Sequence, residues 1–254
     1  MGWLERFRRA PAENAMATAL AAAQKGDYAA ALSIWEPLAR TGNARAQNNI
    51  AACFSGGHGV APDAGIAAKW LKLSAAAGDA VGQRNLATLH FRGEGVPQDD
   101  AEAMRLYRLA ADQGDAAAQD MLSWMLAEQG DYEQARLHAE RAAAQGVAAS
   151  MTRLGNLHHD ALGVERDPVA ALGWWRKAAG LGDADAQAML GAAHLTGAGV
   201  APDPMTALAW LLRARDGGSK LAAKFIPAAT TQLSQAERDE AARRAARLET
   251  GGAP

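Results

Sequence analysis

The glycines recur at a nearly constant interval, and this spacing restricts the fold more than any other feature of the sequence. Six of them are separated by steps of 36, 36, 32, 36 and 36 residues: Gly42, Gly78, Gly114, Gly146, Gly182 and Gly218. A fixed period of this length is typical of a repeat protein, in which each unit buries its apolar face only against its neighbours. The spacing defines five units, at residues 42–77, 78–113, 114–145, 146–181 and 182–217.

Each unit contains two amphipathic runs that predict a pair of helices. The first runs open alike, as in GDAVGQRNLA and GDADAQAMLG, with small residues at matched positions that allow close helix packing: Ala51, Ala87, Gly155 and Gly191. Within the second unit, Leu86 and Leu89 follow the spacing of a buried helical stripe. A glycine, which adopts the left-handed conformation without penalty, ends each helix. The pattern predicts an all-α chain.

In four of the units a glycine-rich loop joins the two helices, as in GEGVPQD and GAGVAPD. We expect a valine of each loop to pack against the core and the closing aspartate to cap the second helix; these aspartates are Asp63, Asp99, Asp167 and Asp203. A phosphate-binding loop would instead need a preceding strand and the pattern GxxxxGK[ST], and neither is present. The glycines therefore mark helix ends.

Further helices are predicted at both ends of the array. The segment AQKGDYAAALSIWEPLARTG places a capping helix pair at residues 12–41, preceded by an arm at 1–11. After Gly218 we expect capping helices over 218–248, with a break at Pro227 and a capping box from Ser234 to Glu237. Residues 249–254 are predicted to be disordered.

The repeats resemble the Sel1-like repeat, a relative of the tetratricopeptide repeat. The resemblance is carried by segments such as GDADAQAMLGAAHLTGAGVAPDPMTALAWLLRARDGG and covers about residues 42–217. The third unit departs from it, because its short linker AEQGDYEQA is typical of the tetratricopeptide repeat, and in the fourth unit Met151 and Ala161 replace the usual Gln and Gly. The resemblance implies an α/α right-handed superhelix, a solenoid with a concave binding surface, and adaptor or scaffold work.

Charge and composition limit the classes of partner. The net charge is −2 and the isoelectric point about 6.3, which gives no basic field for nucleic acid. No stretch of sequence has the length of a transmembrane helix, and the N-terminal segment lacks the apolar core of a signal peptide. With Cys53 as the single cysteine, the paired cysteines of some exported relatives are excluded. We expect a cytoplasmic protein, with a periplasmic location as the alternative, and favour a monomer.

No catalytic, cofactor or metal site is predicted. The chain contains no HExxH motif and no nucleophile elbow. Three histidines share one repeat position, and we expect each to be a core imidazole bonded to a backbone carbonyl: His90, His158 and His194. Equivalent residues in stacked repeats are roughly 10 Å apart, too far for one metal ion.

Tryptophans of the second helices are predicted to be core residues, namely Trp35, Trp70, Trp174 and Trp210. Trp124 differs because it lies in a first helix, where by analogy with tetratricopeptide repeats the side chains line the concave face. Two interpretations of Trp124 stay open, an anchor for a peptide or packing against the short third linker.

Other first-helix residues should share that face, where amide and guanidinium groups could hold the backbone or the carboxylates of an extended peptide. The predicted partner-binding residues are Asn49, Arg84, Asn85, Phe91, Asp120, Trp124, Arg153, Asn156 and His159. Ordinary solvated helix faces are the alternative for many of them individually.

The function that the sequence favours is a non-enzymatic adaptor that binds a protein or peptide in its groove, in a bacterium with a GC-rich genome. The alternatives are a periplasmic or envelope-associated scaffold in a signalling or secretion assembly and, with no residue constellation in its favour, an enzyme such as a hydrolase. The arm at 1–11 carries Trp3, Leu4 and Phe7 and lies on the first helix pair or docks on a membrane surface or a partner.

Overall fold

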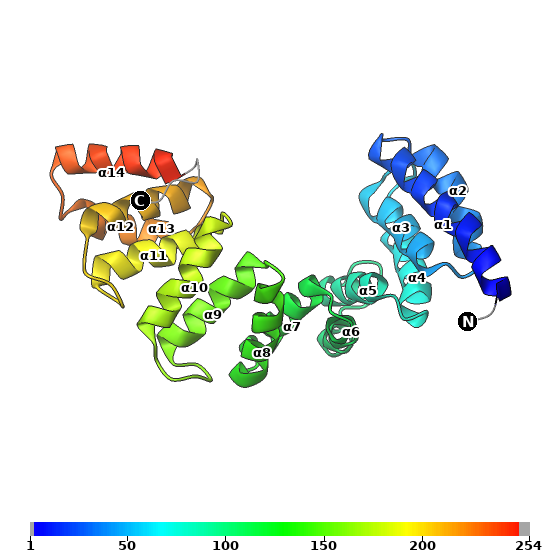
Figure 1. Ribbon diagram of the computed structural model, residues 1–254, viewed down its shortest axis with the longest axis horizontal. Helices are drawn as coiled ribbons and strands as arrows, with labels where there is room; N and C mark the ends of the chain where they lie inside the picture. Colours follow the sequence, from blue (N-terminus) through cyan, green and yellow to red (C-terminus); the bar gives the residue numbers. More distant parts are fainter. Residues whose placement is uncertain (1–2, 249–254) are drawn as a thin grey trace. The chain divides into compact units, whose positions relative to one another are not determined.

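A computed structural model describes the chain from Trp3 to Leu248, with side chains from Glu13 to Leu248 (Figure 1). These residues form α-helices and no strand, which confirms the predicted all-α class. The side chains of the expected arm at 1–11 and the whole expected tail at 249–254 lie outside the described residues.

The helices follow one another as pairs. The first pair is α1 (Trp3–Gln24) and α2 (Tyr28–Arg40). Five repeats come next: α3 (Ala44–Gly56) with α4 (Ala64–Ala76), α5 (Ala80–Arg92) with α6 (Asp100–Asp112), α7 (Ala116–Glu128) with α8 (Tyr132–Ala144), α9 (Ala148–Asp160) with α10 (Pro168–Gly180), and α11 (Ala184–Thr196) with α12 (Pro204–Asp216). The last helices are α13 (Ala222–Thr230) and α14 (Gln235–Leu248).

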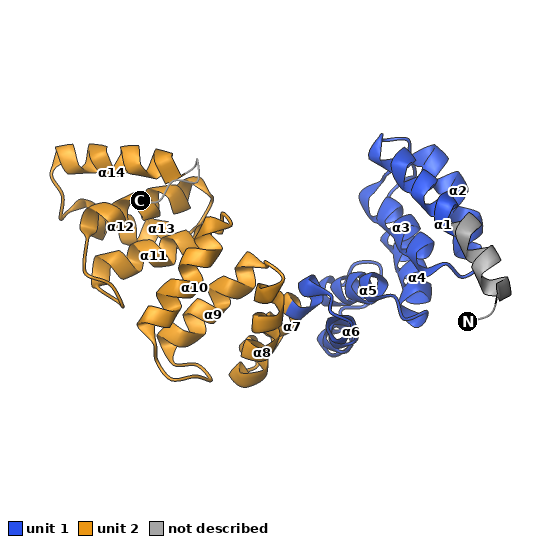
Figure 2. Cartoon of the chain, in the orientation of Figure 1, with its two compact units in different colours: residues 1–119 blue, residues 120–254 orange. Residues whose placement is uncertain are grey.

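The chain forms two compact units, residues 1–119 and 120–254, which divide within α7 (Figure 2). The first unit holds the first and second repeats, and the second unit holds the fourth and fifth. The third repeat, α7 and α8, contains the division. Each unit is described below by itself.

The predicted N-caps of the second helices are confirmed. The side chain of Asp63 accepts the N–H of Ile66 at 2.9 Å, and Asp99 accepts that of Glu102 at 2.9 Å. Asp167 and Asp203 each accept two N–H groups of their helices. The free donors at each helix start are thereby satisfied locally, as an N-cap requires.

A buried glutamine joins each of four first helices to the second helix before it. Gln47 donates to the carbonyl of Ala39 at 3.0 Å and Gln119 to that of Ala111 at 3.1 Å. Gln83 and Gln187 make the equivalent bonds to Ala75 and Ala179. In the fourth repeat the buried Met151 occupies this position, so that junction is apolar.

The glycine that precedes the valine of each long loop packs against the start of an earlier second helix. Gly95 has a φ of +69°, and a Cβ there would collide with the backbone of Ala64. Gly59, Gly163 and Gly199 are packed in the same way against Tyr28, Tyr132 and Pro168. A side chain at these positions would displace the loop from the helix, so glycine is required. The third repeat has only a three-residue connection, 129–131, in place of this loop.

The core expectation holds fully for Trp35, which is 3% exposed, and only in part for the other three tryptophans, which pack against the core but are not fully buried. Trp70, Trp174 and Trp210 are half-buried, and the amino group of Lys177 lies 4.2 Å from the ring centroid of Trp174. The fully buried position is one residue later, where Trp175 is 1% exposed. One residue turns a helix by roughly 100°, enough to move a side chain from the core to its edge.

Gly155 and Gly191 confirm the expected close packing of the two helices in a repeat. A Cβ on Gly155 would collide with the indole of Trp175, and one on Gly191 with Leu211. Large side chains of the second helix thus fill the space that small residues of the first helix leave open.

At the C-terminal end, the predicted break at Pro227 is wrong, because α13 continues through it to Thr230. A proline in so short a helix removes only one of its few internal hydrogen bonds. The capping box is confirmed: the backbone N–H of Ser234 donates to Glu237 at 2.8 Å, and Glu237 N–H donates to Ser234 Oγ at 3.4 Å. Helix α14 packs against α12 and buries Ala241 and Ala245.

Candidate functional site

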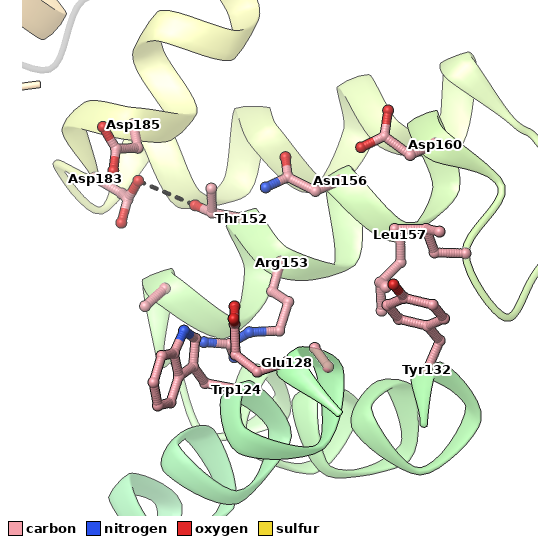
Figure 3. Close-up of a pocket in the computed structure, with 13 residues that line it drawn as sticks. Trp124, Glu128, Tyr132, Thr152, Arg153, Asn156, Leu157, Asp160, Asp183 and Asp185 are labelled. Atoms are coloured by element: carbon pink, nitrogen blue, oxygen red, sulfur yellow. Dashed lines mark hydrogen bonds between the residues drawn. The ribbon is translucent and has the colours of Figure 1, made fainter. Parts of the chain in front are cut away.

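A hollow of about 500 Å³ opens in the second unit beside the first helices of its repeats (Figure 3). We call it the groove. It is lined by Trp124, Ala127, Glu128, Tyr132, Ala149, Thr152, Arg153, Asn156, Leu157, Asp160, Leu162, Asp183 and Asp185. Two of the nine predicted residues, Asp120 and His159, do not line the groove but are discussed with it because they contact residues that do.

The helical period places these side chains together. Along α9, Arg153, Asn156 and Asp160 are three and four residues apart and so share one face. Trp124 and Glu128 have the same relation on α7. Tyr132 is the first residue of α8, and Asp183 is the N-cap of α11. The groove is therefore assembled from helices rather than from flexible loops, apart from Leu162.

Trp124 is the exposed aromatic residue of the groove, with 37% of its surface accessible. Tyr132 is half-buried and backs onto the loop of the fourth repeat, where Gly163 packs against it. In Figure 3 the two rings lie toward opposite ends of the lining, with Arg153 between them. Large amphipathic rings offer much contact area at a small cost in side-chain entropy.

Asn156 is held from below by the buried tryptophan of the same repeat. The indole Nε1 of Trp175 donates to Asn156 Oδ1 at 3.1 Å. Because this bond uses Oδ1, it leaves the Nδ2 group of Asn156 as a donor in the lining of the groove, and Figure 3 draws this group on the side of Thr152. An amide fixed in this way can bind a peptide carbonyl.

Arg153 is already engaged within the chain. Its Nη1 lies 2.8 Å from Asp120 Oδ1 and 3.3 Å from Ser123 Oγ, and Ser150 Oγ donates to the same Asp120 oxygen at 2.6 Å. The two charged side chains are only 16% and 18% exposed. Arg153 and Asp120 therefore tie α9 to α7, which differs from the expected role of binding a peptide carboxylate.

Acidic side chains dominate the rest of the lining. Asp183 Oδ1 accepts the hydroxyl of Thr152 at 3.0 Å and the N–H of Ala186 at 2.8 Å. Asp185 accepts the hydroxyl of Ser219 at 2.6 Å, and Asp160 lies 2.7 Å from His159 Nδ1. Sequence reasoning missed these carboxylates because it looked for groups that bind anions. For Asp160 the available signal was its position one turn after Asn156, and Glu128 has the same relation to Trp124.

His159 itself does not line the groove. It is half-buried, and its ring centroid lies 5.5 Å from that of Trp175. The Nδ1 atoms of His90, His158 and His194 are buried and make no hydrogen bond within the described part of the chain, so the expected bond to a backbone carbonyl is not formed through Nδ1.

The predicted residues of the first unit are also mostly engaged. Arg84 forms an ion pair with Asp115 at 2.9 Å, and Asn85 donates to Asn48 at 2.8 Å. Phe91 is half-buried. Asn49 lines a separate hollow of about 590 Å³ between α1 and α3, with apolar and oppositely charged neighbours. The structure brings Trp124, Arg153 and Asn156 together in one site and leaves the others outside it.

Neither a metal centre nor a membrane helix is found in the part of the chain that the structure describes. No three histidine, cysteine, aspartate or glutamate side chains there converge as ligands. None of the described helices combines the length and the hydropathy that a membrane crossing requires.

Sequential helix pairs with an open surface along their first helices define the class of helix-pair repeat proteins. The chain belongs to the Sel1 repeat family, whose model matches residues 44–79, 80–115, 116–147, 148–183 and 184–219. The resemblance and the five repeats expected from the sequence are confirmed. Repeats of this family generally mediate protein interactions and are typically non-catalytic.

Solved structures with the same architecture include a Sel1 repeat protein from Oxalobacter formigenes. It is 28% identical, with a TM-score of 0.76 over 82% of this chain and 88% of the other. A protective antigen of uropathogenic Escherichia coli with an SLR fold is 23% identical, with a TM-score of 0.42 over 89% and 68%. An immunity protein from Pseudomonas aeruginosa is 20% identical, with a TM-score of 0.49 over 81% of each chain. Among curated proteins, none matches the sequence.

Proposed function

We propose that the protein is a non-enzymatic adaptor that binds an extended segment of a partner protein in the groove of its second unit. The observation that carries this proposal is Trp124, an exposed aromatic side chain at a hollow of about 500 Å³. Elsewhere in this repeat array large aromatic residues are buried or half-buried, and exposed aromatic anchors dominate the energy of many interfaces.

The surrounding groups support an extended peptide as the ligand. The amide of Asn156 is fixed by Trp175 and offers a donor to a main-chain carbonyl. Apolar surface from Ala127, Ala149 and Leu157 lies in the same hollow. Arg153 and Asp120 stabilise the junction of α7 and α9. Because this part of the lining is held in place before a ligand binds, the entropic cost of binding is lowered.

Trp124→Ala is expected to weaken peptide binding by roughly 1–3 kcal/mol. Random peptides displayed on phage are selected on the immobilised full-length chain, and the selected peptides are titrated against both proteins by fluorescence anisotropy. Val169→Ala on α10 is the matched control, because Val169 is also an exposed apolar residue of the second unit. Thermal melting shows whether each variant remains folded.

Equal affinity of the selected peptides for the Trp124→Ala variant and the parent would contradict the proposal. So would a selection that enriches no peptide on the parent chain. Loss of binding in the Val169→Ala variant would move the site to the second helices.

A further inference from the structure

We propose that the groove recognises a basic side chain, lysine or arginine, of its partner segment. This inference rests on the proposed function and adds the chemistry of the ligand. It follows from the charges of the lining, from the helix ends that carry them, and from the aromatic residues beside them.

The charge of the lining is strongly acidic once internal pairs are taken into account. Four carboxylates line the groove: Glu128, Asp160, Asp183 and Asp185. Among the described residues, none of the four forms an ion pair with a lysine or arginine. Asp160 contacts the imidazole of His159, which is a cation only when it is protonated. Arg153 is the one basic residue of the lining, and Asp120 neutralises it. A cationic ligand would therefore be attracted and an acidic one repelled.

Two of these carboxylates occupy positions that a helix disfavours. Glu128 is the last residue of α7 and Asp160 the last residue of α9. The C-terminal end of a helix carries partial negative charge, so an acidic residue there is unfavourable and a basic one favourable. The second repeat follows the favourable rule, with Arg92 at the end of α5. Asp112 and Asp216 end α6 and α12 in the same way, so Glu128 and Asp160 are distinguished from them by their place in the lining of the hollow.

The remaining carboxylates are held in place with acceptor capacity to spare. Both hydrogen bonds to Asp183 use Oδ1, and the one from Ser219 to Asp185 also uses Oδ1. The Oδ2 atom of each is left to accept from a ligand. A lysine ammonium has three donors and an arginine guanidinium five, which suits several carboxylates around one hollow.

The aromatic residues complete the fit. Long basic side chains lay their aliphatic stems on apolar surface while the charged end reaches polar groups. Trp124 and Tyr132 supply such surface in the same hollow, and a cation near an aromatic face gains further attraction. An acidic peptide or a nucleic acid would face the four carboxylates with no accessible cation to bind it.

Two pools of synthetic octapeptides test this inference. The pools are random at all positions but one, which is fixed as lysine or arginine in the basic pool and as glutamine in the neutral pool. Binding to the immobilised full-length chain is measured at low and at high salt. At low salt we expect the basic pool to bind roughly fivefold more tightly than the neutral pool, and the difference to shrink at high salt.

The variant Glu128→Gln/Asp160→Asn should lose this preference for the basic pool. The control variant Asp216→Asn/Asp239→Asn removes two exposed carboxylates of α12 and α14, changes the net charge equally, and should keep the preference. Melting temperatures confirm that both variants fold.

Each outcome separates the two proposals. If neither pool is preferred while Trp124-dependent binding of selected peptides persists, the inference of a basic ligand is overturned and the proposed function stands. A preference that survives in the Glu128→Gln/Asp160→Asn variant places basic recognition elsewhere and also overturns it. If no peptide binds in a Trp124-dependent way, the proposed function fails and the inference with it.

Discussion

The second repeat, in the first unit, and the fourth repeat, in the second unit, share one backbone framework but treat the same carboxylate differently. In the second repeat Arg84 pairs with Asp115, the N-cap of the next first helix. Thr152 occupies the position of Arg84 in the fourth repeat, and it gives Asp183 only a hydroxyl hydrogen bond. The charge of Asp115 is thus compensated and that of Asp183 is not. One position sets the charge of the surface without changing the fold.

A second contrast lies between the two helices of these repeats. The hydroxyl groups of Tyr107 and Thr88 are 2.9 Å apart in the second repeat, whereas Trp175 donates to Asn156 in the fourth. In both cases a buried aromatic of the second helix satisfies its polar atom on the first helix. The fourth repeat uses the larger ring and, in doing so, holds an amide in the lining of the groove. Core packing and site geometry are therefore coupled there.

The largest expected effect comes from removing that ring. Trp175→Ala should lower the free energy of unfolding by roughly 3–5 kcal/mol, because it leaves a cavity next to Gly155. The neighbouring Trp174→Ala should cost less, about 1 kcal/mol, since its side chain is only partly buried at the edge of the core. Denaturant unfolding followed by circular dichroism measures both. Equal losses in the two variants would contradict the assignment of Trp175 as the core residue.

A smaller effect is expected when the fourth repeat is given the charge pattern of the second. Thr152→Arg should place a guanidinium beside Asp183 as Arg84 lies beside Asp115. We expect the affinity for the basic octapeptide pool to fall about threefold to fivefold, with stability little changed. Thr152→Val, which removes the hydroxyl without adding charge, is the control. An affinity that rises in the Thr152→Arg variant would show that Asp183 does not contribute to the site.

The smallest effect extends the comparison to the fifth repeat. Burial lowers the pKa of His194 from its ordinary value of 6.5, so the folded protein favours the neutral imidazole. The unfolded chain then binds more protons below that pH, and the contribution of His194 to stability is present above about pH 6.5 and is lost as the pH falls. The first repeat has Phe54 at this position.

His194→Phe should therefore make the loss of stability between about pH 7 and pH 5 less steep than in the parent chain. Melting temperatures measured over this range for both proteins provide the test. If the two profiles are parallel, protonation of His194 does not couple to folding.

Local rules predicted the parts of the fold that depend on neighbouring residues. The caps by Asp99 and Asp203 need only the first turn of their own helix, and both are confirmed. The rotation of a helix about its axis is not local, and for that reason the sequence did not distinguish Trp174 from Trp175. Gly155 was the clue, because its missing side chain makes room for the indole.

The site was predicted less completely than the fold. The exposed Trp124 followed from its place in the repeat, but the partners of the arginines did not. Arg84 binds a residue 31 positions later, and Arg153 binds one 33 positions earlier. Such pairings depend on side-chain reach across helices, and several acidic residues were available to each arginine. Once the pairs are known, the unpaired carboxylates around the groove become apparent.

In each compact unit the loop glycines contact helices that come earlier in the sequence. Gly95 packs against the start of α4, and Gly199 packs against the start of α10. Each loop therefore docks on a helix that precedes it in the sequence. During synthesis on the ribosome, that docking surface emerges before the loop does. The loop of a newly made repeat can therefore dock at once, whereas the second helix of that repeat still receives a bond from the next first helix, as Ala75 does from Gln83. Shortening a unit from its C-terminal end removes loops but leaves the remaining ones docked, whereas shortening it from the N-terminal end would strip a loop of its seat.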